Sequence, residues 1–147
     1  MKDIVEIEIN VPQAAAAGLF SDPANNTKWM EGLKSYEALS GEPGVPGSKY
    51  RLVPKSGDRV FVVTVVKKEL PRTSELALDA PNMTVSVSGR FIALSAQKTK
   101  LVSEEIFAFK GIFGKLFGVL AWPAIRRAHR RQMEAFKRFA ENKVSAA

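Results

Sequence analysis

Residues 123–144 read PAIRRAHRRQMEAFKRFAENKV, and this stretch decides the class of fold that the chain can adopt. At about 100° per residue, a helix through it collects its apolar side chains on one face and its arginines on the other. The apolar face carries Ile125, Met133 and Phe136. The pattern predicts a long amphipathic helix, which Pro123 either begins or kinks.

The excess positive charge of the chain lies on this helix and just before it. From Lys110 to Ala147 there are nine basic and two acidic residues, whereas the residues before them carry equal numbers of both, so the net charge of +7 belongs to this part. A basic patch suits an anionic partner, either a nucleic acid or a membrane surface. A solvated helix face is the alternative, since exposed helix faces are often rich in Lys and Arg.

Upstream of the helix, the hydrophobic period changes from helical to two, which is typical of β-strands. The strands are expected at residues 4–10, 36–39, 49–53, 59–69, 74–79, 83–94 and 98–109. Short turns rich in Gly and Pro separate the last six, which predicts an antiparallel meander. Two short helices are expected after the first strand, at Gln13–Phe20 and from Pro23 toward Trp29.

The composition excludes several kinds of site. The 147 residues include no cysteine and one histidine, so disulfides, thiolate metal sites, Cys nucleophiles and multi-His metal sites are ruled out. No serine nucleophile elbow and no dinucleotide fingerprint occurs. We therefore expect no metal and no cofactor. The length of the chain predicts a single domain spanning residues 1–147.

Targeting signals are not expected either. The first residues carry charges where a signal peptide needs an apolar run, and no uncharged stretch reaches the roughly 18–20 residues of a membrane span. The expected location is the cytoplasm, either free or peripheral at a membrane.

Two N-terminal segments carry a resemblance to a known family. Residues 5–12 (VEIEINVP) and 19–29 (LFSDPANNTKW), with the turn at 44–50 and the amphipathic end at 127–141, are similar to the Bet v 1/START-like (SRPBCC) superfamily. The segments also resemble the bacterial polyketide cyclase/dehydrase and lipid-transport members of this superfamily. The resemblance covers nearly the whole chain and implies an α+β helix-grip fold. In that fold, a curved antiparallel sheet of about seven strands wraps around a long C-terminal helix, with two short helices after strand 1 and an apolar cavity inside.

Nine residues are candidate ligand contacts in such a cavity. Aromatic side chains with a polar end suit a pocket wall, and apolar residues of the sheet and the helix complete it. The candidates are Trp29, Tyr36, Tyr50, Phe91, Glu105, His129, Gln132, Met133 and Phe136. No catalytic constellation is recognisable, so the catalytic residues stay unknown.

The three polar candidates other than the tyrosines each have an alternative. A buried His129 could act as a general acid or base, but no pattern supplies an orienting partner, so a structural wall histidine is the alternative. Gln132 could orient a ligand or reach solvent. Glu105 shares parity with Leu101, and its pKa would rise in a cavity; alternatively, Glu104 and Glu105 straddle an irregularity at the sheet edge.

The segment FKGIFGKLFGVLAW, residues 109–122, has hydrophobic residues beyond a single helical stripe. Apolar residues followed by a basic cluster match an element that docks on a membrane surface. The predicted surface consists of Phe113, Leu116, Phe117, Leu120 and Trp122, with Arg126, Arg127, Arg130 and Arg131. A lid over the cavity and a homodimer contact are the alternatives, and the sequence does not decide the oligomeric state.

Two functions follow from these observations. The first is binding of a hydrophobic small molecule or lipid in the cavity, with docking on an anionic membrane. The alternative is an enzyme of the polyketide cyclase/dehydrase type, in which His129, Gln132, Tyr36 or Glu105 would polarise carbonyls of an aromatic polyketide-like substrate. Nucleic acid is the least supported partner, because the basic face lacks interleaved aromatic residues.

Overall fold

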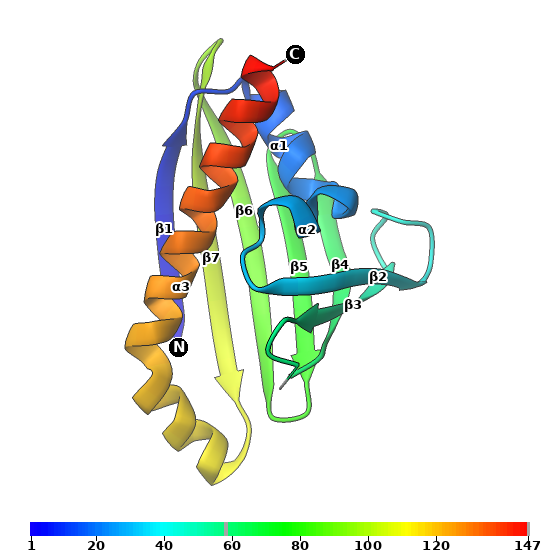
Figure 1. Ribbon diagram of the computed structural model, residues 1–147, viewed down its shortest axis with the longest axis vertical. Coiled ribbons are helices and arrows are strands. Elements are labelled where there is room, and N and C mark those ends of the chain that lie inside the picture. The colour runs from blue at the N-terminus through cyan, green and yellow to red at the C-terminus, as the bar shows by residue number, and fades with distance from the viewer. Residues whose placement is uncertain (58, 147) are drawn as a thin grey trace.

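The computed structural model describes residues 1–57 and 59–146, and its elements follow the expected order (Figure 1). They are β1 (Lys2–Ile9), α1 (Gln13–Ser21), a 3-10 turn η1 (Pro23–Asn25), α2 (Asn26–Trp29), β2 (Leu33–Ser40), β3 (Lys49–Pro54), β4 (Phe61–Glu69), β5 (Thr73–Ala80), β6 (Met83–Ser95), β7 (Lys98–Phe109) and α3 (Gly111–Ser145).

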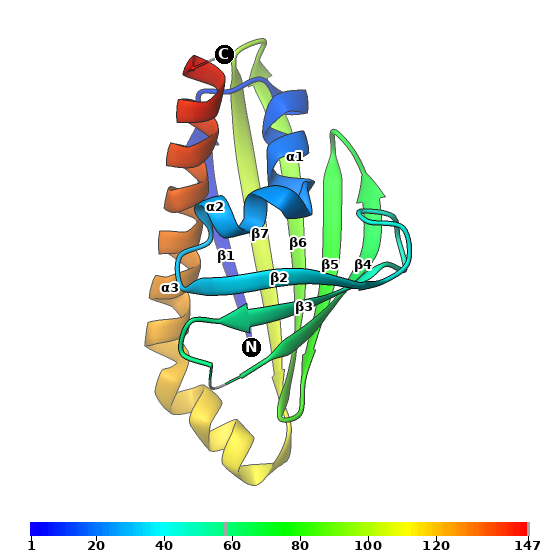
Figure 2. The same ribbon diagram turned by 45° about the vertical axis from the view of Figure 1, so that its right-hand side comes forward.

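The seven strands form one antiparallel sheet in the order β1-β7-β6-β5-β4-β3-β2. Strands β2 to β7 pair with their neighbours in sequence, as short turns between them require, whereas β1 pairs with β7, from Lys2 opposite Ile106 to Ile9 opposite Thr99. The sheet curves so strongly that β2 and β3 cross in front of the longer strands, and α3 runs along its open side (Figure 2). The expected helix-grip fold is confirmed.

Helix α3 is longer than the sequence pattern predicts. It begins at Gly111, so the apolar segment 111–122 is helical and Pro123 lies inside the helix instead of beginning it. A proline has no backbone N–H and therefore removes one hydrogen bond of the helix. The helix changes direction in its lower part (Figure 1), and a bend is the usual result of an internal proline.

The main core lies between the sheet and the second half of α3. Met133, Phe136 and Ala140 of the helix are buried against strand residues such as Val5 and Leu101. Aromatic rings of the short helices join them: the ring of Phe20 lies 5.0 Å from that of Phe136. Burial of such an aromatic side chain contributes about 1.5–3 kcal/mol, so this cluster fixes the helix on the sheet.

Strand β1 begins two residues earlier than the alternation suggested. Its inward row therefore starts with Asp3 and continues with Val5 and Ile9, all of which are buried. A carboxylate placed in a buried row needs a partner, because an unpaired buried charge is costly. The partner is described below.

Candidate functional site

A cavity of about 110 Å³ lies between the concave face of the sheet and helices α1, α2 and α3. Six aliphatic side chains form most of its sheet wall: Leu52, Val63, Val65, Leu76, Leu78 and Val87. A cavity of roughly 150 Å³ lined by apolar side chains can hold benzene. The space therefore suits a ring-sized group, and a longer ligand requires the walls to move apart.

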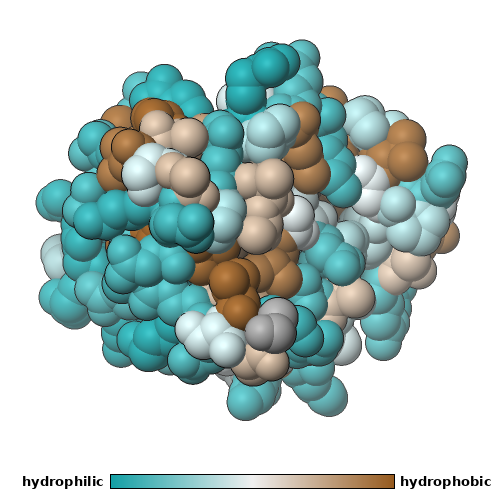
Figure 3. Space-filling model, turned by 90° about the horizontal axis from the view of Figure 1, so that it is seen from above, coloured by the Kyte–Doolittle hydropathy of each residue, from teal (hydrophilic) through white to brown (hydrophobic). Residues whose placement is uncertain are grey.

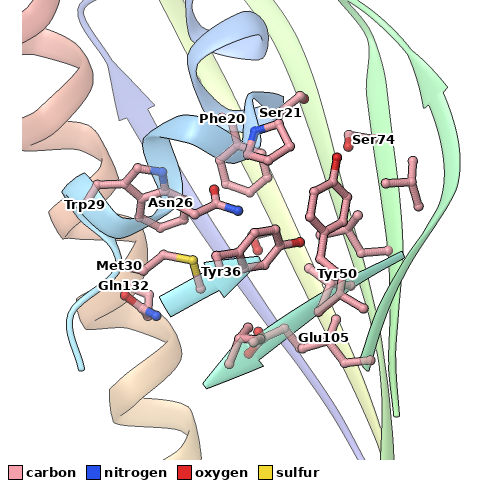
Figure 4. Close-up of a pocket in the computed structure, with 18 of the residues that line it drawn as sticks. Phe20, Ser21, Asn26, Trp29, Met30, Tyr36, Tyr50, Ser74, Glu105 and Gln132 are labelled. Atoms are coloured by element: carbon pink, nitrogen blue, oxygen red, sulfur yellow. The ribbon is translucent and has the colours of Figure 1, made fainter. Parts of the chain in front are cut away.

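Six of the nine candidate contacts line this cavity. They are Trp29, Tyr36, Tyr50, Glu105, Gln132 and Met133. Figure 4 shows that they come from opposite walls, with Trp29 near α2, Gln132 on α3 and the two tyrosines on the sheet side. Residues that are distant in sequence therefore meet around one space.

The two tyrosines form a stacked pair on neighbouring strands. The rings of Tyr36 and Tyr50 lie 4.9 Å apart, and the Tyr50 hydroxyl accepts a hydrogen bond from the N–H of Gly44 at 2.6 Å. Burial, together with the nearby Tyr50, raises the pKa of Tyr36. The Tyr36 hydroxyl therefore keeps its proton and is able to donate a hydrogen bond.

The other three candidates lie elsewhere. Phe91 and Phe136 belong to the packed core cluster instead of the cavity wall, because α1 and α2 fill the space in front of them. His129 lies behind the wall, with 3% of its surface exposed. The sequence pattern assigns these three residues to the inward face of the helix or the sheet. It does not show which inward-facing side chains line the cavity and which are packed in the core.

His129 is held by two partners that the sequence did not indicate. Its Nδ1 lies 2.8 Å from Oδ2 of Asp3 on β1, and its Nε2 lies 2.9 Å from Oγ of Ser103 on β7. The guanidinium of Arg126 also donates to Asp3 Oδ1, at 3.1 Å. An ionised Asp3 accepts a hydrogen bond from Nδ1–H, and Nε2 then accepts one from the Ser103 hydroxyl. The two contacts therefore favour the Nδ1–H tautomer.

The order Ser103–His129–Asp3 matches that of a serine hydrolase relay. Ser103 lines the cavity, although its side chain has no solvent-exposed surface, whereas His129 does not line it. The contacts of His129 satisfy the buried carboxylate of Asp3 and tie α3 to β1 and β7. The structural alternative for His129 is the one that this geometry favours.

Glu105 is the acid of this cluster that reaches the cavity. The pairing of β7 with β6 runs without interruption past it, with Glu105 opposite Val87, and β7 lies inside the sheet. The irregular sheet edge considered for Glu104 and Glu105 is therefore wrong. Burial raises the pKa of the Glu105 carboxyl; the nearby His129 lowers it and Asp3 raises it further.

Asp3 and Ser103 are the residues that sequence reasoning missed. A signal for each was present, since Asp3 extends the alternation of Val5 and Ser103 shares the parity of Glu105. Across the described residues, no three His, Asp or Glu side chains are arranged to hold a metal ion.

The first third of α3 exposes a continuous apolar surface. Ile112 is 80%, Phe113 84% and Leu120 73% exposed, and Leu116, Phe117 and Val119 are also exposed. We call these six residues the apolar tip. No residue of the segment 111–122 lines the cavity described above, which argues against a lid over it.

The apolar tip is held on the sheet from its other side. The ring of Trp122 lies 5.7 Å from that of Phe107, so Trp122 is half-buried instead of fully available to a partner. Phe117 packs 6.2 Å from Phe109 and lies under the guanidinium of Arg59. The four predicted arginines, Arg126, Arg127, Arg130 and Arg131, are exposed. Taking the described residues alone, we find no helix with both the length and the apolar character needed to cross a membrane.

A curved antiparallel sheet that closes on a long helix over an apolar cavity defines the START-like class of ligand-binding folds. Residues 5–141 match the family described as "Polyketide cyclase / dehydrase and lipid transport", and the chain belongs to this family. The resemblance noted in the sequence is thereby confirmed.

Solved structures with the same fold are distant in sequence. The Zhui aromatase/cyclase from Streptomyces sp. R1128 has a TM-score of 0.79 at 14% identity, covering 98% of this chain and 95% of its own. Protein TTHA0849 from Thermus thermophilus has a TM-score of 0.79 at 13% identity, and the match covers 100% of this chain and 99% of that protein. A START superfamily protein from Mycobacterium smegmatis has a TM-score of 0.72 at 16% identity, and the match covers 99% of this chain and 97% of that protein. None of the curated protein sequences matches this chain. These likenesses establish the fold.

Proposed function

We propose that this protein binds a hydrophobic small molecule or a lipid group in the cavity between the sheet and α3. The observation that carries the proposal is the cavity itself, which has aliphatic and aromatic walls and a few polar groups, Tyr36, Glu105 and Gln132 among them. Specific sites for small molecules have this composition: apolar surface supplies the affinity, and a few polar groups fix the orientation.

Uptake of a neutral apolar dye tests this proposal. N-phenyl-1-naphthylamine is expected to bind the purified protein with increased fluorescence, and native mass spectrometry is expected to detect a copurified apolar compound. Leu76→Trp fills the cavity and is expected to reduce dye binding at least tenfold. Val66→Trp is the control, because Val66 lies on the neighbouring strand and is 53% exposed. Absence of dye binding, or equal binding by both variants, would contradict the proposal.

The ligand is proposed to be exchanged at an anionic membrane, on which the apolar tip of α3 docks. At about 100° per residue, Ile112, Leu116 and Leu120 lie on the same side of the helix as Arg127 and Arg130. Insertion of the apolar side chains would therefore bring the arginines to lipid headgroups, which is the arrangement of an interfacial helix. Figure 3 shows the opposite end of the molecule, where hydrophobic areas are broken up by hydrophilic residues.

Sedimentation with vesicles tests the docking. The protein is expected to pellet with vesicles containing phosphatidylserine and to stay in the supernatant with pure phosphatidylcholine, at low salt. The double variant Phe113→Ser/Leu120→Ser is expected to lose at least tenfold in partitioning, whereas Leu94→Ser, at an exposed position on β6, is the control. Equal partitioning to both vesicle types would contradict the role of the arginines.

A second candidate is catalysis of the polyketide cyclase/dehydrase type. The observation in its favour is that Tyr36, Glu105 and Gln132 line one cavity, where they could polarise carbonyl oxygens. His129 contributes less to this candidate, since both of its nitrogens are engaged. Turnover of a poly-β-ketone that persists unchanged in Glu105→Gln and Tyr36→Phe would count against the enzyme.

A further inference from the structure

The cavity and the surface of this protein have opposite electrostatic character. The net charge of +7 is carried outside, largely by arginines of α3 whose side chains are exposed. Among the described residues that line the cavity, none is a lysine or an arginine, and Glu105 is the one carboxylic acid. A ligand that enters therefore leaves the basic surface behind and meets a single carboxyl group.

Among the residues that the structure describes, the groups around Glu105 provide no free cation for an anionic ligand. Its cross-strand neighbour on β1 is Asp3, a second acid, which accepts from Arg126 on the outer side. On α3, His129 Nδ1 lies 3.5 Å from Glu105 Oε1, but this nitrogen is closer to Asp3, and Nε2 is bound to Ser103. From β2 and β3, the cavity receives the phenol groups of Tyr36 and Tyr50.

Several groups on the cavity wall can donate a hydrogen bond. Figure 4 shows Glu105 at one end of the cavity, with Tyr36 and Gln132 on other walls. The oxygen of Gln132 accepts from the N–H of Glu31 at 3.1 Å, which leaves its amide N–H groups to donate. Burial raises the pKa of the Tyr36 hydroxyl, which favours its protonated, donating form.

These observations exclude one class of ligand and favour another. Transfer of an ionised group from water to a site without a counter-charge is strongly unfavourable, and a nearby acid adds repulsion. A neutral carbonyl oxygen avoids both penalties and can accept from the donors named above. We propose that the cavity selects uncharged apolar ligands with a hydrogen-bond-accepting oxygen, such as a ketone, and rejects carboxylates and phosphates of similar shape; this inference rests on the proposed ligand-binding function.

Two compounds of matched shape test the selection. The ketone 2-acetylnaphthalene and the anion 2-naphthoate differ mainly in a methyl group against a charged oxygen. Each is titrated at pH 7.5 against bound N-phenyl-1-naphthylamine. The ketone is expected to displace the dye at a concentration at least tenfold lower than the anion. Displacement by the anion within threefold of the ketone would overturn the inference and leave the proposed function intact.

Matched variants assign the effect to the cavity acid. Glu105→Gln replaces the carboxyl group with a neutral amide of the same shape, so binding of naphthoate is expected to improve at least threefold, with the ketone unchanged within threefold. Glu104→Gln is the control, because Glu104 lies on the other face of β7, near Lys2, and is expected to leave the ratio unchanged. An equal effect of both variants would overturn the role of Glu105. Failure of the dye to bind the wild-type protein would overturn the proposed function itself.

Discussion

The two ends of α3 use apolar residues in opposite ways. In its second half, Phe136 and Ala140 have no exposed surface and hold the helix against the sheet. In its first third, Ile112 and Phe113 leave more than three quarters of their surface exposed. Both ends belong to one continuous helix, so the difference does not come from secondary structure.

This difference separates stability from recognition along one helix. Side chains that the fold buries contribute to its free energy of unfolding, whereas a large exposed apolar surface contributes little to it and is typical of a site for a partner. Substitutions at the two ends should therefore affect different measurements, and the predictions below test that separation.

The largest expected effect is at the buried end. Phe136→Ala is expected to lower the free energy of unfolding by about 3–5 kcal/mol, because it leaves a cavity in the core. Phe113→Ala, at the exposed end, is expected to change it by less than about 0.5 kcal/mol. Urea denaturation measures both values. Similar losses for the two variants would remove the distinction between the ends.

Removal of the histidine is expected to come next. His129→Ala leaves the buried Asp3 without one of its partners and should cost about 3 kcal/mol. Arg126→Ala removes the other partner, but the Arg126 side chain is mostly exposed, so the cost should stay below about 1 kcal/mol. Thermal unfolding at neutral pH compares the two variants. A larger loss for the arginine would show that Asp3 depends on the surface contact instead.

A smaller effect is expected where the apolar tip rests on the sheet. A Cβ atom added at Gly118 would lie 2.5 Å from the Phe109 ring, so Gly118→Ala must push the helix away and should cost about 1–3 kcal/mol. At Gly114 the added atom meets only ordinary contacts, and Gly114→Ala should stabilise the helix by up to about 1 kcal/mol. In urea denaturation, the free energy of unfolding is expected to fall for Gly118→Ala and to rise for Gly114→Ala. A change of the same sign in both variants would contradict the close approach of Gly118 to the Phe109 ring.

The smallest expected effect depends on pH. Because burial raises the pKa of Glu105, the folded state favours its protonated form. Its contribution to stability is complete below the ordinary carboxyl range and is lost as the pH rises through the raised pKa of the folded state. Glu105→Gln should therefore increase the melting temperature at pH 8 relative to wild type by more than it does at pH 4. A constant difference across this range would contradict the raised pKa.

The fold could be predicted from the sequence to a large extent, because its signals are local. Alternation in the strand segments and the helical period of residues 125–140 are set by side chains a few positions apart, and the observed β7 has the predicted bounds, Lys98–Phe109. The start of α3 stays open in the sequence, because Pro123 suits either the first residue of a helix or a kink within it, and the glycines before it weaken the helical signal; the structure has Pro123 inside the helix.

The site could be predicted only in part. Trp29 and Tyr36 suited a pocket wall by residue type, and the structure places both on it. The separation of Phe91 and Phe136 from the cavity depends on how α1 and α2 fill the interior, which no pattern along the chain encodes. The bond between Asp3 and His129 joins residues 126 positions apart, so only the three-dimensional pairing of β1 with β7 reveals it.

That pairing also has a consequence for the order of folding. The backbone N–H of Phe107 donates to the carbonyl of Met1, 106 residues earlier in the chain, and β1 has β7 as its neighbour in the sheet. A growing polypeptide therefore emerges from the ribosome with β1 unable to pair until nearly the whole sheet has been synthesised. Such distant contacts slow folding and leave the apolar face of β1 exposed meanwhile. This protein is accordingly expected to fold slowly and to depend on chaperones during synthesis more than a helical protein of equal length.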